Sequence, residues 1–99
     1  MNVDAKARRA LLTIRACLGT GRYRVLAHFM RRMDQRGLVW PDVLAVVDDP
    51  RSVRDAGRDR HDRPKWTIAG TAADGEPIEL ICVLDIDEHG RVTVFITIY

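Results

Sequence analysis

Three side chains in the first third of the sequence have types and a spacing that suit RNA cleavage. His28, Arg32 and Arg36 follow one another at four-residue intervals, and a helix places residues with that spacing on one ridge. A histidine titrates near neutral pH and can move the proton of a 2′-hydroxyl or of a leaving oxygen. Arginine can stabilise a charged phosphorane, because its planar guanidinium gives a phosphate two parallel hydrogen bonds. We call these three residues the ridge, and the chemistry we predict for it needs no metal ion.

Four further residues are predicted to complete this site. Arg31 lies further round the same helix, and Lys65 supplies a cation from an adjoining strand. Thr97 can donate a hydrogen bond to a phosphate, and Tyr99 can act as a proton donor or as a platform on which a base stacks. The predicted catalytic residues are therefore His28, Arg32, Arg36 and Tyr99, and the predicted substrate-binding residues are Lys65, Thr97 and Arg31.

The ridge also has a purely structural interpretation. Like charges one helical turn apart repel each other by a few tenths of a kcal/mol, so an anionic group must lie near the two arginines. That group is either a substrate phosphate or an acid of the same chain, such as Glu79, Asp85 or the aspartates of residues 55–62. The sequence leaves both interpretations open.

The other reactive residue types are not spaced for metal or thiol chemistry. His61 and His89 lie beside acids but form no recognisable metal-ligand spacing. Cys17 and Cys82 lack the paired spacing of a zinc site or a redox motif, and both fall in apolar patterns. We therefore predict buried thiols in a reducing cytoplasm, with no metal and no organic cofactor.

Charge is distributed unevenly along the chain, although the formal net charge is only +2. Residues 1–36 carry nine basic and two acidic side chains, a formal charge of +7, whereas residues 37–99 carry seven basic and twelve acidic ones, a charge of −5. A basic head on an acidic body indicates either a polyanionic partner such as RNA or self-complementary packing. One form of such packing is a homodimer in which the head of one chain meets the body of another.

Helical periodicity dominates before residue 50, and the spacing predicts helices over residues 3–18, 25–36 and 41–49. Residues 23–25 either begin the second helix or form a short extended piece. The second helix is expected to bury one apolar stripe, which comprises Leu26, Phe29, Met30 and Met33. Glycine or proline follows each predicted helix and ends it.

Strand patterns dominate after residue 50. Residues 65–71, 77–85 and 91–99 alternate or are apolar and are separated by short turns, and residues 51–54 are a candidate fourth strand. We expect an α+β domain with two or three N-terminal helices packed on one face of a three- to four-stranded antiparallel sheet. In the last strand Val92, Val94, Ile96 and Ile98 are expected to face the helices, which would leave Thr93, Phe95, Thr97 and Tyr99 on the other face.

Length and composition limit the class of protein. With 99 residues, 46% of them hydrophobic, the chain is expected to be a single domain with one modest core. Its longest apolar runs fall far short of the roughly 20 residues that a membrane span needs. Charged residues stand at positions 4, 6, 8, 9 and 15, within the segment where a secretory leader would be apolar. These patterns predict a cytoplasmic protein without a membrane segment.

From Tyr23 onward, the sequence resembles a family of small prokaryotic proteins of unassigned function. The resemblance rests on an ordered set of motifs, namely His28, Arg32-Met33, Arg36-Gly37, a short helix over 41–47, Gly70-Thr71, Asp74-Gly75 and Ile96-Thr97-Ile98-Tyr99. We therefore predict that residues 22–99 form the core of the domain and that the helix within residues 1–21 is an addition to the pattern.

That family is distantly similar to the RelE and BrnT toxin ribonucleases. The similarity implies helices on an antiparallel sheet, RNA as the substrate, and an antitoxin protein as a partner. Together with the ridge, it predicts a metal-independent endoribonuclease of a toxin–antitoxin system. The alternative is a non-catalytic module that binds protein or nucleic acid.

Overall fold

Sequence signals set the ends of the first helix in the computed structural model, which describes residues 4–99. Helix α1 (Ala5–Gly19) begins at Asp4, whose carboxylate accepts a hydrogen bond from the amide of Ala7 over 2.7 Å. Such a cap satisfies an amide that the first turn of a helix leaves free. The helix ends at Gly19, one residue beyond the predicted end, whereas the predicted start at residue 3 lies outside the described residues.

The next two helices are short and follow each other closely. Helix α2 (Ala27–Gln35) stops just before Gly37, which adopts a φ of +65° that favours glycine. Helix α3 (Trp40–Asp48) carries Pro41 in its first turn, and the carboxylate of Asp42 accepts the amide of Val39 over 2.8 Å. Asp42 also accepts the amide of Ala73 over 3.1 Å and so ties the start of α3 to a turn of the sheet.

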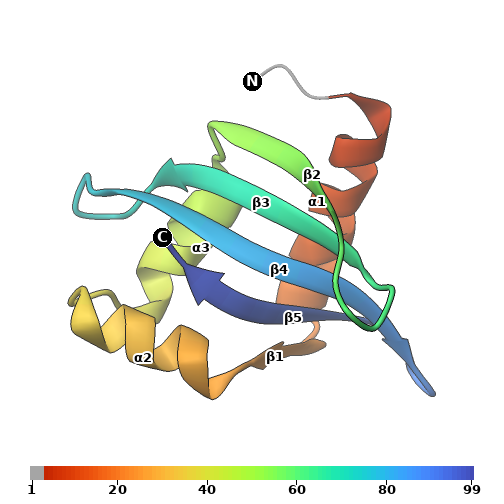
Figure 1. Ribbon diagram of the computed structural model, residues 1–99. Helices are drawn as coiled ribbons and strands as arrows, with labels where there is room; N and C mark the ends of the chain where they lie inside the picture. Colours follow the sequence, from red (N-terminus) through yellow and green to blue (C-terminus); the bar gives the residue numbers. More distant parts are fainter. Residues whose placement is uncertain (1–3) are drawn as a thin grey trace.

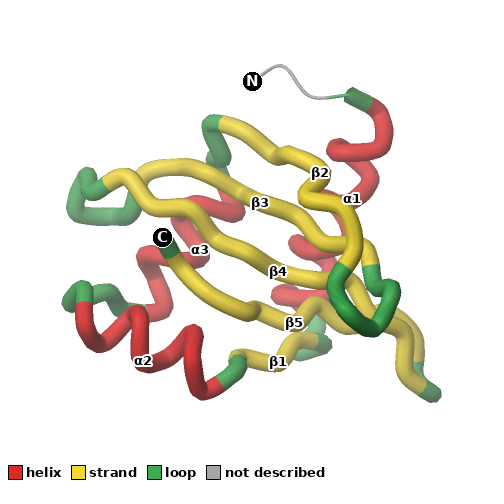
Figure 2. Tube along the Cα trace, in the orientation of Figure 1, coloured by secondary structure: helices red, strands yellow, loops and turns green. Residues whose placement is uncertain are grey.

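Five strands form one mixed sheet in the described part of the chain, with the order β1-β5-β4-β3-β2 (Figures 1 and 2). The strands are β1 (Tyr23–Val25), β2 (Ser52–Arg58), β3 (Pro64–Thr71), β4 (Pro77–Asp87) and β5 (Gly90–Ile98). Strands β2 to β5 pair antiparallel in sequence order, and β1 pairs parallel to β5. The predicted α+β class with helices packed on the sheet is confirmed. The sheet has one strand more than predicted, because residues 23–25 form the extended piece that was one of the two alternatives.

The predicted division of β5 between the two sheet faces is wrong over residues 92–95 and confirmed at Thr97 and Ile98. Thr93 and Phe95 are fully buried on the side of the helices, and Phe95 lies 5.5 Å from Phe29 between ring centroids. Strand β5 contains a bulge: Thr97 pairs with Ile81, but the next residue of β4, Cys82, pairs with Phe95. An extra residue shifts the alternation, so Ile98 returns to the helix side while Val92 and Val94 form a second apolar cluster with Val83.

Helices α1 and α3 lie behind the sheet in Figure 1, and α2 runs below β5. Four aromatic rings, those of Tyr23, Phe29, Trp40 and Phe95, pack together where α2, α3, β1 and β5 meet. Helix α1 packs against β5 and β2 and buries Leu11 and Ile14 in the same core cluster as Trp66. The extra N-terminal helix therefore completes the hydrophobic core instead of standing apart from it.

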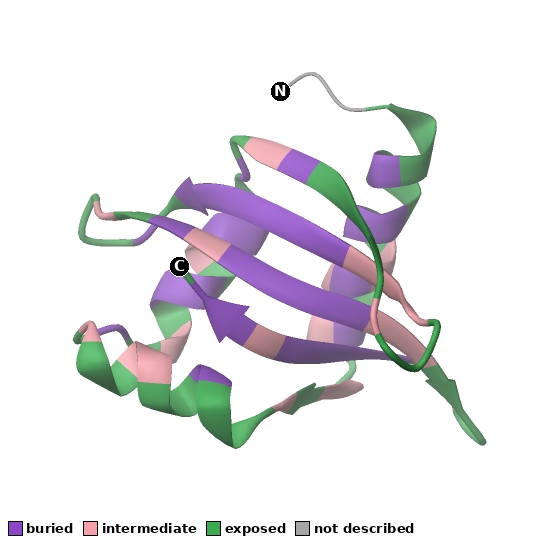
Figure 3. Ribbon diagram, viewed as in Figure 1, coloured by how far each residue is buried: buried purple, intermediate pink, exposed green. Residues whose placement is uncertain are grey.

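The apolar stripe predicted for α2 is only half buried. Phe29 is inaccessible and Met33 packs against the core, but Leu26 and Met30 are 41% and 53% exposed. Helix α2 has only nine residues and packs mainly against β5, and most of its surface is exposed in Figure 3. It therefore buries only a narrow stripe, which explains the two exposed positions.

The close approach of α3 explains why β3 has a glycine at position 70. A Cβ atom at this position would lie 3.1 Å from Cγ1 of Val46 in α3 and 3.5 Å from the backbone of Pro50. Helix α3 therefore approaches the sheet so closely that any side chain at this position would force Val46 to shift.

Candidate functional site

A cavity of about 620 Å³ lies on the sheet face opposite α1 and α3, which we call the outer face. Its floor is formed by side chains of β3, β4 and β5, which include Lys65, Thr67, Ile81, Val83, Ile96 and Thr97. One wall is the β2–β3 hairpin, which curls over the front of the sheet in Figure 1. We call this space the outer-face cavity, and its size is that of a typical small-ligand site.

Strand register explains how the floor is assembled. Thr67 pairs with Ile81, which pairs with Thr97, so the two hydroxyls flank an isoleucine across three strands. Two residues before Thr67 in β3, Lys65 pairs with Val83 of β4. Tyr99 follows the end of β5, where its amide and carbonyl both bond to Glu79 over 2.9 Å. This pairing fixes the Tyr99 backbone at the cavity rim, while the residue remains 63% exposed.

The hairpin wall is held in shape by Asp59. Its carboxylate accepts the amides of His61 and Arg63 over 3.0 and 2.9 Å, and it forms an ion pair with the Arg63 guanidinium at 2.7 Å. The hydrogen bond from the Arg63 side chain is the main reason why the pKa of Asp59 falls from 3.8 to about 2. Asp62 takes a φ of 60°, which lets the chain reverse. These contacts place Arg60 and His61 at the cavity.

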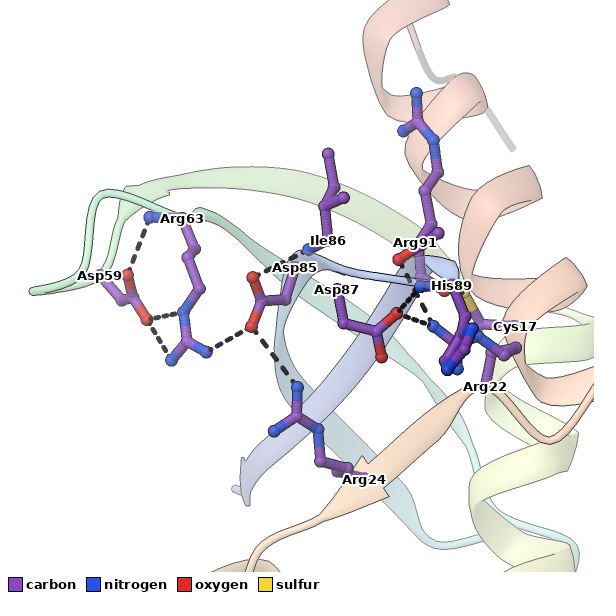
Figure 4. Close-up of polar contacts among 11 residues, drawn as sticks. Cys17, Arg22, Arg24, Asp59, Arg63, Asp85, Ile86, Asp87, His89 and Arg91 are labelled. Atoms are coloured by element: carbon purple, nitrogen blue, oxygen red, sulfur yellow. Dashed lines mark hydrogen bonds and ion pairs between the residues drawn. The ribbon is translucent and has the colours of Figure 1, made fainter.

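Ion pairs continue from the hairpin across the outer face (Figure 4). Arg63 lies between two carboxylates, because it contacts Asp85 at 3.1 Å as well as Asp59. Asp85 in turn contacts Arg24 of β1 at 3.5 Å. The pKa of Asp85 is lowered, first by the amide of Ile86 and then by Arg63. A chain of alternating charges thus joins the hairpin to β4 and β1.

Two cations at the cavity are not engaged by acids. Lys65 forms no ion pair with any acid among residues 4–99, and Arg60 contacts only Nε2 of His61, at 3.3 Å. Arg58, by contrast, donates to the carbonyl of Asp62 over 2.7 Å. The cavity therefore offers positive charge, hydroxyl groups, a histidine and an exposed tyrosine beside an apolar floor.

The predicted site residues fall into two groups. Lys65, Thr97 and Tyr99 line the outer-face cavity. The α2 residues His28, Arg31, Arg32 and Arg36 do not line it. The catalytic and binding roles predicted for both groups stay predictions.

Both ridge arginines are engaged by the protein itself. Arg32 donates from Nε to the carbonyl of Ile98 over 3.1 Å, and Arg36 forms an ion pair with Glu76 at 2.6 Å. An acid of the chain thus lies against the ridge, as the structural interpretation requires, but it is Glu76 of the β3–β4 turn. The acids named for that role have other partners, since Glu79 pairs with Arg54 and Asp85 with Arg63.

The charge asymmetry along the sequence is largely resolved within the fold. Four cations of the basic head form ion pairs with acids of the body, in the pairs Lys6–Asp55, Arg22–Asp87, Arg24–Asp85 and Arg36–Glu76. Arg15 donates to the carbonyls of Val47 and Asp48 at the end of α3, where the helix dipole is negative. The head meets the body of its own chain, so its charge alone no longer argues for a dimer.

The sequence-based prediction missed the hairpin residues Arg58, Arg60 and His61, because it ended the candidate fourth strand at residue 54, whereas β2 continues to Arg58. Their alternating Asp and Arg pattern was the available signal. Asp59 and Arg63 lie four residues apart and close the turn on themselves, and this closure brings the three missed side chains to the cavity.

The cysteines and histidines form no metal centre in the part of the chain that the structure describes. No three His, Cys, Asp or Glu side chains there are grouped as metal ligands. Cys17 and Cys82 are both buried and free, as predicted, and burial raises the pKa of Cys82 to about 12. Over residues 4–99, no helix is long and apolar enough to cross a membrane.

Together, the fold and the site define a small α+β domain with a cationic cavity on the open face of its sheet. Residues 25–99 match the family model described as Domain of unknown function (DUF4258), and the chain belongs to that family. A search of curated proteins and a search of solved structures each found no match. Helix α1 lies outside the matched residues, in agreement with its description above as an addition.

Proposed function

We propose that the outer-face cavity binds single-stranded RNA and that the protein is a metal-independent endoribonuclease of the toxin type. One observation carries this proposal: His61, Lys65, Thr97 and Tyr99 converge on one cavity from a hairpin, two strands and the C-terminus. Phosphate requires cations and hydroxyl donors, and a base requires an aromatic or apolar surface. A duplex keeps its bases stacked, so a concave site of this kind suits an unpaired strand.

The chemistry follows from the residue types at the cavity. The 2′-hydroxyl of the bound strand attacks the adjacent phosphorus and displaces the 5′-oxygen, which leaves a 2′,3′-cyclic phosphate and a 5′-hydroxyl. One group must take the proton of the 2′-hydroxyl and another must supply a proton to the leaving oxygen. His61 and Tyr99 are the titratable histidine and tyrosine of the cavity, and Lys65 and Arg60 can stabilise the charged phosphorane.

The resemblance to RelE and BrnT ribonucleases supports the toxin assignment and adds an antitoxin protein as a partner and the cytoplasm as the location. Inducing the protein in a bacterium tests this level of the proposal. We expect growth arrest together with loss of RNA integrity, and relief of both when an antitoxin encoded beside this protein is co-expressed. Normal growth with intact RNA would refute the toxin assignment.

The decisive experiment in vitro compares variants at the cavity with a variant on the ridge. The substrate is a fluorescently labelled single-stranded RNA incubated in EDTA, and the products are examined for a cyclic phosphate end. We expect His61→Ala and Tyr99→Phe to lower the cleavage rate by about 10²-fold or more, the usual size of an acid–base contribution. If His28→Ala abolishes cleavage and His61→Ala does not, the ridge is the catalytic site and the assignment to the cavity is wrong.

Binding is measured separately with Lys65→Gln. Removing one phosphate contact should weaken binding and reduce the slope of log K against log salt by about 1. The matched control is Arg8→Gln, which removes one exposed cation of α1 that does not line the cavity. Equal losses in the two variants would mean that the protein attracts RNA only through its overall charge.

A second function, non-catalytic RNA binding, is favoured by one observation. Both ridge arginines are bound to the chain itself, so the constellation that first suggested catalysis has a structural role. This alternative predicts salt-dependent binding that Lys65→Gln weakens, without cleavage by the wild-type protein under any of these conditions.

A further inference from the structure

The end of the β2–β3 hairpin is attached to the rest of the molecule by very little. Residues 54–58 and 60–62 are exposed, and the pairing of β2 with β3 is irregular between Asp55 and Arg58. The polar side-chain contacts of Arg58, Asp59, Arg60 and His61 lie within the hairpin itself. Across the described residues, two polar side-chain links join residues 56–63 to the rest of the chain. The Gly57 amide donates to Asp55 of β2, which pairs with Lys6 of α1, and Arg63 contacts Asp85 of β4. Only the Arg63–Asp85 contact reaches the residues that carry Arg60 and His61 from across the sheet.

The Arg63–Asp85 contact fixes the position of the Arg63 side chain. The Arg63 guanidinium is shared between Asp59 in the hairpin and Asp85 in β4, with atom separations of 2.7 and 3.1 Å. Asp85 is itself fixed, because its other oxygen accepts the amide of Ile86 over 2.8 Å and Arg24 approaches the shared oxygen from β1. Figure 4 shows the Arg63 guanidinium between the carboxylates of Asp59 and Asp85.

We propose that Asp85 is a positioning residue: through Arg63 it holds the β2–β3 hairpin in place as the wall of the outer-face cavity. The wall supplies Arg60 and His61, whereas Asp85 itself does not line the cavity. Asp85 therefore acts on bound ligand only through the hairpin. The effect on RNA affinity rests on the proposed function, whereas the effect on the hairpin does not.

The substitution Asp85→Asn tests the proposal, because its effect on charge and its effect on the hairpin should change the RNA affinity in opposite directions. It removes a negative charge and leaves every cation in place, so electrostatics alone would strengthen RNA binding. Loss of the clamp frees the hairpin and should instead weaken binding, by about two- to fivefold, the range that a partly exposed ion pair sets. The matched control is Asp87→Asn, which removes the same charge two residues along β4 from a pair with Arg22 that does not involve the hairpin.

Two measurements are made on the wild type and both variants. The first is the affinity for single-stranded RNA at fixed salt. The second, made without RNA, is hydrogen exchange at the amides of Asp59 and His61, which are bonded within the hairpin over 3.0 Å each. We expect Asp85→Asn alone to weaken RNA binding and to speed exchange at both amides by about two- to fivefold, with Asp87→Asn binding RNA at least as tightly as the wild type.

The outcomes separate the two proposals. Unchanged hairpin exchange in Asp85→Asn overturns the clamp, whatever happens to RNA binding. Faster exchange with RNA binding as tight as that of Asp87→Asn overturns the role of the wall in binding. If the wild type binds no RNA, the proposed function fails, and the exchange measurement alone then decides whether Asp85 holds the hairpin.

Discussion

Replacing Thr93 with valine should make the protein more stable, although threonine and valine have the same shape. Thr93 is completely inaccessible, and its Oγ1 is the one buried side-chain polar atom without a hydrogen-bond partner among residues 4–99. A buried hydroxyl that has lost its water without gaining a partner costs about 1–3 kcal/mol. Thr93→Val removes that cost, fills the same space, and keeps the amide that bonds to the carbonyl of Arg22 over 3.1 Å.

The expected gain is about 1–2 kcal/mol in the free energy of unfolding. In a domain of this size each kcal/mol raises Tm by about 4–8 °C. Urea unfolding followed by circular dichroism gives the first quantity, and a thermal scan gives the second. Because only a side chain changes, the dependence of the unfolding free energy on urea should keep its slope.

Thr93→Ser is the matched control, since it keeps the hydroxyl and removes the methyl group. Losing one buried methyl should cost about 0.8 kcal/mol, so the order of stability should be valine, threonine, serine. A valine variant that is less stable than the wild type would refute the reasoning. It would mean that the Thr93 hydroxyl has a partner or a role that its surroundings do not reveal.

Two further predictions concern the added helix and the ion pairs. Ile14→Ala should lower the unfolding free energy by about 2–5 kcal/mol, because Ile14 is fully buried where α1 meets the sheet; urea unfolding checks this, and a loss below about 1 kcal/mol would show that α1 is dispensable. Acid should destabilise the protein as the pH falls from about 4 to about 2, since the pKa of Asp59 is lowered from 3.8 to about 2 and those of Asp85 and Asp87 are also lowered. A folded-state pKa below the unfolded value adds stability above the unfolded pKa, and that stability is lost as the pH falls through the folded one. In Asp59→Asn, the unfolding free energy should depend less steeply on pH over this range. A pH dependence identical to that of the wild type would contradict the assignment.

Local sequence signals determined the elements of this fold well. Gly21, Gly37 and Pro50 follow helices and end them for reasons that need no tertiary contact, namely the left-handed backbone angles of the two glycines and the missing amide of the proline. The β3–β4 and β4–β5 turns were equally clear, because Gly75 and Gly90 take positive φ angles that favour glycine. The α+β class follows from those elements, since an amphipathic helix and a half-apolar strand must bury their apolar sides against each other.

The sequence of β5 alone could not decide which of its side chains face the helices. Both alternating sets of residues in that strand are mainly apolar or β-forming, so either could have faced the helices. A bulge opposite Ile81 and Cys82 combined parts of both sets on the helix side, where Phe95 completes a cluster with Tyr23 and Trp40. A bulge depends on the pairing of two strands, and a single strand's sequence does not reveal it.

The sequence by itself determined which side chains are available for chemistry, and the tertiary structure decided which of them meet. His28, Arg32 and Arg36 share a ridge because helical geometry is local, but only the fold shows that Ile98 and Glu76 occupy the two arginines. Lys65 and Thr97 were predicted to belong together, and strand pairing places both at one cavity. His61 joins them because Asp59 and Arg63 close a hairpin over the sheet. Which charges pair depends on distances between residues far apart in the chain, and those distances exist only once the core has formed.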